Sequence, residues 1–227
     1  MKMYDLTHTL SPEIPHWNGG CGFQFQTILD YADCAEAVKF RVQKLDMFSG
    51  IGTHVDAPLH CIQGGKSIAD IPLEDLIAPC IVIDVTKKAH EKYSATVDDV
   101  GEFENQYGRI ASGTFVILRT GWEKHWHTPE KYRNNLIFPS FSKEAVEVLL
   151  NRNIIGIGID TLSPDRADDG FPVHQLILGA GKYIIENIAN ADSLPAVGAY
   201  VIALPIKIQN GTEAPIRLIG FTDKVDD

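Results

Sequence analysis

The chain has 227 residues, 44% hydrophobic and 22% charged, which is typical of one folded domain and excludes a disordered chain. The formal net charge of −10, with no basic cluster, argues against nucleic acid or an anionic membrane as a partner. No apolar stretch reaches the roughly 20 residues of a membrane-spanning helix, and residues 1–10 lack a signal-peptide core, so we expect a cytoplasmic protein.

The first half of the chain predicts strands, turns and two helices. Residues 1–20 form an extended entry that ends at a turn. The alternation of apolar and polar residues over 40–48 and the β-branched run 78–85 are typical of strands. A short helix is expected over 68–76, with Pro72 in its first turn, and another within 94–107.

The second half continues the mixture of strands and helices. Further strands are expected at 114–119, 155–160, 199–205 and 216–221. Ser142 is a suitable N-cap for a helix over 142–151, and 171–190 is expected to be helical on both sides of Gly179–Gly181. The polar and aromatic stretch 123–140 is interpreted as a long loop or lid. We therefore predict one α/β domain over 1–227, with a mixed sheet and flanking helices.

The four cysteines carry little information about function. None is in a C-x-x-C pair, and a cytosolic protein of this size needs no disulfide, so free thiols are expected. Cys61 follows His60 and could be read as a nucleophile beside a base. Neighbours on a strand point to opposite faces, however, which argues against their contact.

The segment Gly52–His60 contains the first candidate metal ligands. In an extended segment the side chains of His54 and Asp56 face the same point, because residues i and i+2 share a face. Pro58 should bend or end the strand, and this bend could bring His60 back toward the same point. Imidazole and carboxylate groups in this arrangement suit Zn²⁺ or Mn²⁺, although one such spacing also occurs by chance.

A second candidate pair, His174 and Glu186, lies far along the chain. On one unbroken helix these residues would be roughly 18 Å apart and could not share a metal ion. The glycines between them allow a break, after which both side chains could converge. Trp17 is either a pocket aromatic or an anchor for the entry strand. Asp160, Ser163 and Asp165 follow a predicted strand, at the end where α/β proteins often place sites, but turn capping explains Ser163 and Asp165 equally well.

The segment Gly52–His60 resembles the signature of the cyclase family of metal-dependent hydrolases, which includes bacterial kynurenine formamidases and isatin hydrolases. Weaker similarities accompany it in the same order along the chain: Asp5–Ser11 with Pro15 and Trp17, Leu118–Trp122, Gly158–Ser163, His174, Glu186–Asn187, Leu194–Ala196 and Leu204–Lys207. The resemblance implies a β/β/α fold of the swivelling type, assembled as a homodimer or homotetramer.

The resemblance also implies roles for individual residues. His54 and Asp56 match ligands of a first metal ion, and Asp56 would bridge to a second ion held by His174 and Glu186. His60 matches the residue that donates and accepts the proton, and Trp17 matches an aromatic residue of the substrate pocket. Many members carry another histidine ligand at the position of Gly50, so the resemblance leaves one or two Zn²⁺ or Mn²⁺ ions open, with a slight preference for one. It also leaves open whether His60 is the base or is recruited as a metal ligand in place of the missing histidine.

These observations predict a metal-dependent amidohydrolase, similar to an arylformamidase, that acts on an amide, formamide or lactam of a small aromatic substrate. His60 would carry the proton from the attacking water to the leaving nitrogen. Two alternatives remain. The same scaffold could bind a metal or small molecule without catalysis or with altered activity, or Cys61 could be the nucleophile of a cysteine hydrolase.

Overall fold

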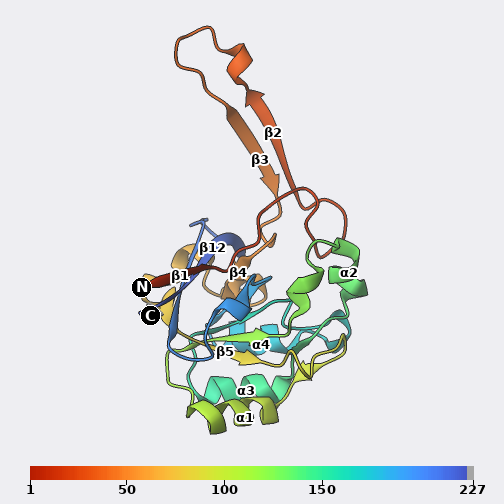
Figure 1. Ribbon diagram of the computed structural model, residues 1–227, viewed down its shortest axis with the longest axis vertical. Coiled ribbons are helices and arrows are strands. Elements are labelled where there is room, and N and C mark those ends of the chain that lie inside the picture. The colour runs from red at the N-terminus through yellow and green to blue at the C-terminus, as the bar shows by residue number, and fades with distance from the viewer. Residues whose placement is uncertain (224–227) are drawn as a thin grey trace.

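An eight-stranded mixed sheet closes on itself at the centre of the molecule (Figure 1). The computed structural model describes residues 1–223. The strands follow the order β1-β12-β11-β5-β7-β9-β10-β4, and β12 also pairs with β4, so that all of them except β1 form a ring. Their bounds are β1 Lys2–Asp5, β4 His54–Asp56, β5 Ile77–Asp84, β7 Phe115–Arg119, β9 Gly156–Ile159, β10 Tyr183–Glu186, β11 Ala199–Pro205 and β12 Glu213–Thr222.

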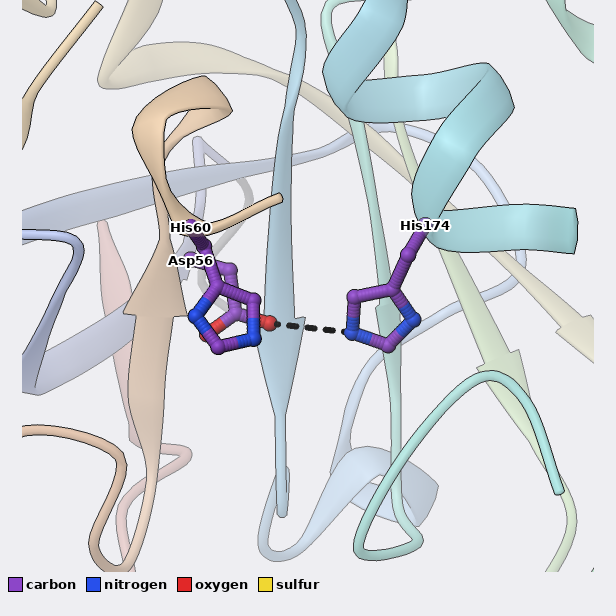
Figure 2. Close-up of side chains that lie close together, drawn as sticks. All are labelled: Asp56, His60 and His174. Atoms are coloured by element: carbon purple, nitrogen blue, oxygen red, sulfur yellow. Dashed lines mark ion pairs between the residues drawn. The ribbon is translucent and has the colours of Figure 1, made fainter. Parts of the chain in front are cut away.

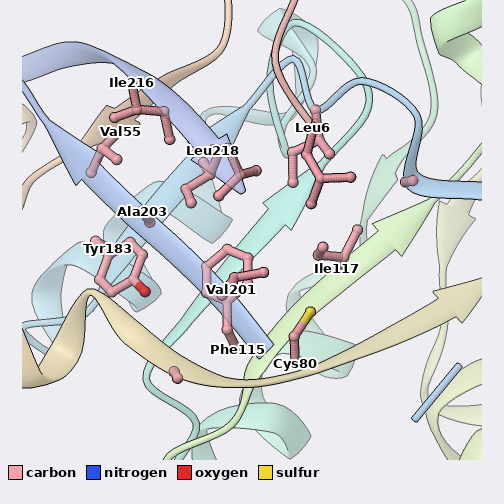
Figure 3. Close-up of a cluster of buried hydrophobic side chains, with 14 of the residues drawn as sticks. Leu6, Val55, Cys80, Phe115, Ile117, Tyr183, Val201, Ala203, Ile216 and Leu218 are labelled. Carbon is pink, nitrogen blue, oxygen red and sulfur yellow. The ribbon is translucent and has the colours of Figure 1, made fainter. Parts of the chain in front are cut away.

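Alternation of side chains along these strands builds two apolar layers. Cys80, Phe115 and Ile117 point inside the ring and pack with residues of the other strands, as Figure 3 shows. Their neighbours Ile81 and Val116 point outward and pack beneath the helices. Because both faces of β5, β7 and β9 are buried, these strands consist of nearly continuous apolar residues.

Three helices cover the outer face of the ring, and α1 and α3 lie side by side there (Figure 1). These three are α1 Val97–Tyr107, α3 Lys143–Asn151 and α4 Pro172–Gly179, and the described residues also form the short helix α2 Pro129–Arg133. The predicted cap of α3 is confirmed, since the Ser142 hydroxyl accepts a hydrogen bond from the Ala145 N–H. In residues 1–223, no helix has the length and apolar character needed to span a bilayer.

A two-stranded hairpin projects from this body (Figure 1). It consists of β2 (Phe23–Leu29) and β3 (Val42–Met47), which pair antiparallel. Phe25 lies opposite Leu45, and both side chains are more than half exposed. Two further short strands, β6 (Ser94–Ala95) and β8 (Ser140–Phe141), pair with each other beside the helices.

The mixed α/β prediction is confirmed, and so are the strands expected at 40–48, 78–85, 114–119, 155–160, 199–205 and 216–221 and the helices expected within 94–107 and 142–151. The helix predicted over 68–76 is wrong, because the structure has two 3₁₀ turns there, Ile68–Asp70 and Leu73–Asp75. Pro72 disfavours a helical conformation at the residue before it, and Ile71 is extended, with φ −68° and ψ 123°.

Two other expectations also need correction. The segment 123–140 is not a loose lid: it contains α2, and Trp126 and Tyr132 are buried. The Tyr132 hydroxyl donates to the main-chain oxygen of Asp160, which ties the segment to the body. Residues 182–190 are not helical, because Gly181 has φ +74° and β10 then pairs between β9 and β4.

Candidate metal centre

Strand β4 places His54 and Asp56 at the outer face of the ring. Val55 between them points into the apolar interior, so that its two neighbours point the opposite way. All three residues are at least 97% buried. Asp56 Oδ1 lies 3.3 Å from His54 Nε2, as the i, i+2 spacing of the two residues led us to expect.

Glu186 and His174 reach the same point from two other elements. Glu186 on β10 lies directly opposite His54 across the sheet, which puts both side chains on one face. Its carboxylate oxygens lie 3.4 Å from His54 Nε2 and 3.5 Å from His174 Nε2. His174 is in the first turn of α4, and its Nε2 is 3.6 Å from Asp56 Oδ2 (Figure 2). The break after α4 therefore brings the pair together, although Glu186 arrives on a strand rather than on a helix.

The donor set of this cluster fits a divalent metal ion. Two imidazole nitrogens and two carboxylates are the ligands that Zn²⁺ and Mn²⁺ bind in proteins. Asp56 Oδ1 is buried and accepts no hydrogen bond from any residue in the described part of the chain, and such an atom is costly without a cation. Burial opposes charge on His54, but the Asp56 and Glu186 carboxylates together outweigh it and raise the pKa of His54. The cluster therefore favours positive charge at its centre.

Each histidine is oriented by its other ring nitrogen, as metal-ligating histidines usually are. His54 Nδ1 lies 2.8 Å from the main-chain oxygen of Gly52, and His174 Nδ1 lies 2.8 Å from Asp165 Oδ2. Asp165 also accepts hydrogen bonds from the main-chain N–H groups of Val173 and His174. From the sequence, turn capping explains Asp165 as well as a site does, and its contact with His174, nine positions later, adds the orientation of a candidate ligand.

His60 stands at the solvent side of the cluster. Pro58–His60 forms a 3₁₀ turn after β4, and this bend brings the His60 ring to 5.8 Å from that of His174, measured between ring centroids (Figure 2). The side chain remains 34% exposed, so His60 can reach both the cluster and a bound molecule. The Glu213 carboxylate, 3.4 Å from His60 Nδ1, raises the pKa of His60, while partial burial opposes this. Nothing in the sequence singled out Glu213.

A cavity of about 550 Å³ opens in front of the cluster. His54, Asp56, His60, His174 and Glu186 lie at its base, and aromatic residues contribute to its walls: His16, Trp17, Phe48 and Phe171. Trp17 packs against Phe171, with 6.0 Å between the ring centroids. All six residues that the sequence analysis named as site residues therefore line one cavity.

A larger hollow of about 880 Å³ contains none of these groups. Its lining mixes opposite charges, including Arg119, Lys124, Glu123 and Asp192. Burial raises the pKa of Glu123 to about 7, and this carboxylate accepts a hydrogen bond from the Asn190 main-chain N–H. The smaller cavity is the better candidate site, because several potential metal ligands converge in it.

Cys61 is poorly suited to act as a nucleophile. All four cysteines are free, as predicted. Burial raises the pKa of the Cys61 thiol, and the thiol donates to the main-chain oxygen of His174 at 3.7 Å. A reactive cysteine needs a lowered pKa, so the structure does not favour the cysteine-hydrolase alternative.

Comparison with known proteins finds a family model and relatives that are named as hydrolases. The Cyclase family model, described as "Putative cyclase", matches residues 4–166. An isatin hydrolase from Roseibium aggregatum is 34% identical over 189 residues, which cover 76% of this chain and 72% of that protein. A kynurenine formamidase from Salinibacter ruber is 27% identical over 221 residues, covering 96% of this chain and 97% of the relative.

Solved structures share the whole fold. Isatin hydrolase A from Labrenzia aggregata, bound to benzyl benzoate, superposes with a TM-score of 0.88 and 33% identity over 98% of this chain and 94% of that one. A protein described as a potential metal-dependent hydrolase with cyclase activity has a TM-score of 0.78 and 28% identity, with 99% of each chain covered. The architecture that the sequence resemblance implied is thus confirmed.

Proposed function

Because the chain belongs to the cyclase family, we propose that it is a metal-dependent hydrolase that cleaves a carbon–nitrogen bond in a small molecule. One observation carries the proposal: His54, Asp56, His174 and Glu186 converge at the base of a cavity with aromatic walls. The chemistry of these ligands favours Zn²⁺ or Mn²⁺. A divalent ion held there would act as a Lewis acid and lower the pKa of a bound water toward 7.

The position of His60 supports a role for it in proton transfer. It lies between the cluster and the open cavity, and Glu213 faces its Nδ1. This leaves Nε2 for the reacting groups. We assign to His60 the transfer of a proton from the attacking water to the leaving nitrogen, a role that needs a group within hydrogen-bond reach of both.

The proposed substrate is a small aromatic amide, formamide or lactam, as in an arylformamidase. Trp17 and Phe171 offer flat apolar surfaces at the wall of the cavity, against which an aromatic ring can stack. Relatives named isatin hydrolase and kynurenine formamidase suggest a lactam and a formamide, respectively. Both reactions hydrolyse a C–N bond beside an aromatic ring.

The test is an assay of the purified protein with N-formylkynurenine and isatin, with added Zn²⁺ or Mn²⁺ and with a chelator. We expect metal-dependent turnover of at least one of them. If neither is hydrolysed, these substrates are rejected; if a chelator leaves turnover unchanged, metal dependence is rejected.

A non-catalytic protein on the same scaffold is the rival function, and Gly50 favours it because one potential ligand position carries no side chain. His60→Ala separates the two possibilities. In an enzyme this variant loses turnover and keeps its metal, whereas a pure binding protein has no turnover to lose.

We also propose that the chain forms a homodimer or homotetramer in which the projecting hairpin contacts a second copy. The hairpin points away from its own body (Figure 1), and Phe25 and Leu45 share one exposed apolar face. A two-stranded hairpin alone is only marginally stable in water, so packing of this face against a partner would stabilise it.

A further inference from the structure

Residue 50 leaves a space beside His54 that another part of the chain fills. Gly50 has no side chain, and a Cβ placed there would overlap Glu213 Oε1 and lie 3.3 Å from His54 Nε2. The carboxylate of Glu213 therefore occupies the volume that a side chain at position 50 would take. This volume adjoins the ring nitrogen with which His54 faces the cluster.

Strand β12 delivers Glu213 to this position. Glu213 pairs directly opposite Asp56 across β12 and β4, just as Glu186 pairs opposite His54 across β10 and β4. Residues opposite one another share a face of the sheet, so a glutamate flanks the two central ligands on each side. The Glu213 side chain is only 19% exposed.

The two oxygens of Glu213 have different surroundings. Oε2 accepts hydrogen bonds from the hydroxyls of Ser49 at 3.1 Å and Thr212 at 3.2 Å, and it faces His60 Nδ1. Within residues 1–223, no group donates a hydrogen bond to Oε1, the oxygen that fills the space at Gly50. One oxygen is thus anchored by hydrogen bonds and the other is left for a ligand, as expected of a ligating carboxylate with hydrogen-bonded support.

Asp56 provides an independent observation on the same side of the cluster. Its Oδ1 is the buried atom that accepts no hydrogen bond among the described residues, and it lies 3.3 Å from His54 Nε2. We infer that Glu213 is a ligand of the divalent ion on the His54 side of the cluster, where it takes the place that Gly50 leaves open. This inference rests on the proposed function, because it requires a metal ion at the cluster.

The test measures metal affinity rather than turnover. Zn²⁺ and Mn²⁺ are titrated into metal-free wild type and Glu213→Gln in competition with a chromophoric chelator, and metal content is measured by elemental analysis. We expect the variant to bind at least about tenfold more weakly, because the amide keeps the shape but loses the charge of the ligand. Glu104→Gln is the matched control, because the Glu104 side chain is 17% exposed, pairs with Arg152 and does not line the cavity. The metal affinity of this variant should equal that of the wild type.

A second test supplies a new ligand at position 50 in place of Glu213. Gly50 has no positive φ, so its backbone accepts a side chain, but the Glu213 carboxylate occupies the space. We expect Gly50→His alone to bind metal more weakly than wild type. The double variant Gly50→His/Glu213→Ala should bind at least about tenfold more tightly than Glu213→Ala, because an imidazole then supplies the missing ligand. This comparison holds even if Glu213→Gln folds poorly, which circular dichroism would reveal.

A third comparison separates ligation from an effect through His60. In the His60→Ala background, a ligating Glu213 still gives the tenfold loss on Glu213→Gln, whereas a residue that only positions His60 gives none. Equal affinity of wild type and Glu213→Gln would also overturn the inference. If the wild type itself binds no metal, the proposed function fails instead, so the two failures are distinguishable.

Discussion

The hairpin β2–β3 and strand β4 follow each other in the chain and depart from the usual distribution of polar and apolar groups in opposite ways. On the hairpin, Phe25 and Leu45 are apolar and exposed. On β4, His54 and Asp56 are polar and buried. Buried polar groups and exposed apolar surfaces are the informative exceptions in a folded protein. Our proposals account for both departures by a binding partner: a cation at β4 and a second copy of the chain at the hairpin.

The largest expected effect comes from Asp56→Ala. Asp56 faces both histidines, with Oδ1 toward His54 and Oδ2 toward His174. We expect metal affinity to fall by more than about 100-fold, since even supporting residues cost about 10–100-fold, and turnover to become undetectable. Elemental analysis and the substrate assay check this. Stoichiometric metal in a folded Asp56→Ala protein would show that the ion binds elsewhere.

His60→Ala should separate the contribution of this residue to catalysis from its contribution to metal binding. We expect turnover to fall by about 10²–10⁴-fold, the usual contribution of a general acid–base group, while metal affinity changes little. Kinetics measure the turnover, and chelator competition on the same preparation measures the metal affinity. Loss of metal from this variant would make His60 a ligand rather than a proton carrier.

Asp165→Asn tests whether the hydrogen bond that orients His174 contributes to metal affinity. Asp165 orients His174 and accepts two main-chain hydrogen bonds at the start of α4. The variant should bind metal about 10–100-fold more weakly. Asp168→Asn is the control, because Asp168 lies in the same segment with a side chain that is 73% exposed. If both variants bind metal like the wild type, the orientation of His174 by Asp165 does not contribute to metal affinity.

The smallest effect on the site should come from the hairpin. Leu45→Asp places a charge on its exposed apolar face and should weaken self-association by about tenfold or more, equivalent to about 1.4 kcal/mol. Metal affinity should stay within about twofold, since Leu45 does not line the cavity. Light scattering over a range of concentrations measures the assembly. A wild-type chain that is monomeric at all concentrations would contradict the proposed contact.

The sequence predicted most of the strands because the β-branched runs of β5, β7 and β9 reflect burial on both faces. It misassigned 183–186 because three apolar residues followed by a glutamate suit a helix or a strand, and only pairing with β9 and β4 decides between them. His54 and Asp56 were predictable as a pair because their spacing is local. Glu213 and Asp165 were not, since their importance depends on the register of β12 with β4 and on the path of the chain into α4.

The most direct test of the account is the metal content of the purified chain. Wild type, His54→Ala and His174→Ala are dialysed against excess Zn²⁺ or Mn²⁺, freed of unbound ions and measured by elemental analysis. The account predicts at least one ion per chain in the wild type and less than a stoichiometric amount in both variants. A wild-type chain that retains no stoichiometric metal at neutral pH, or variants that retain as much as the wild type, would contradict it.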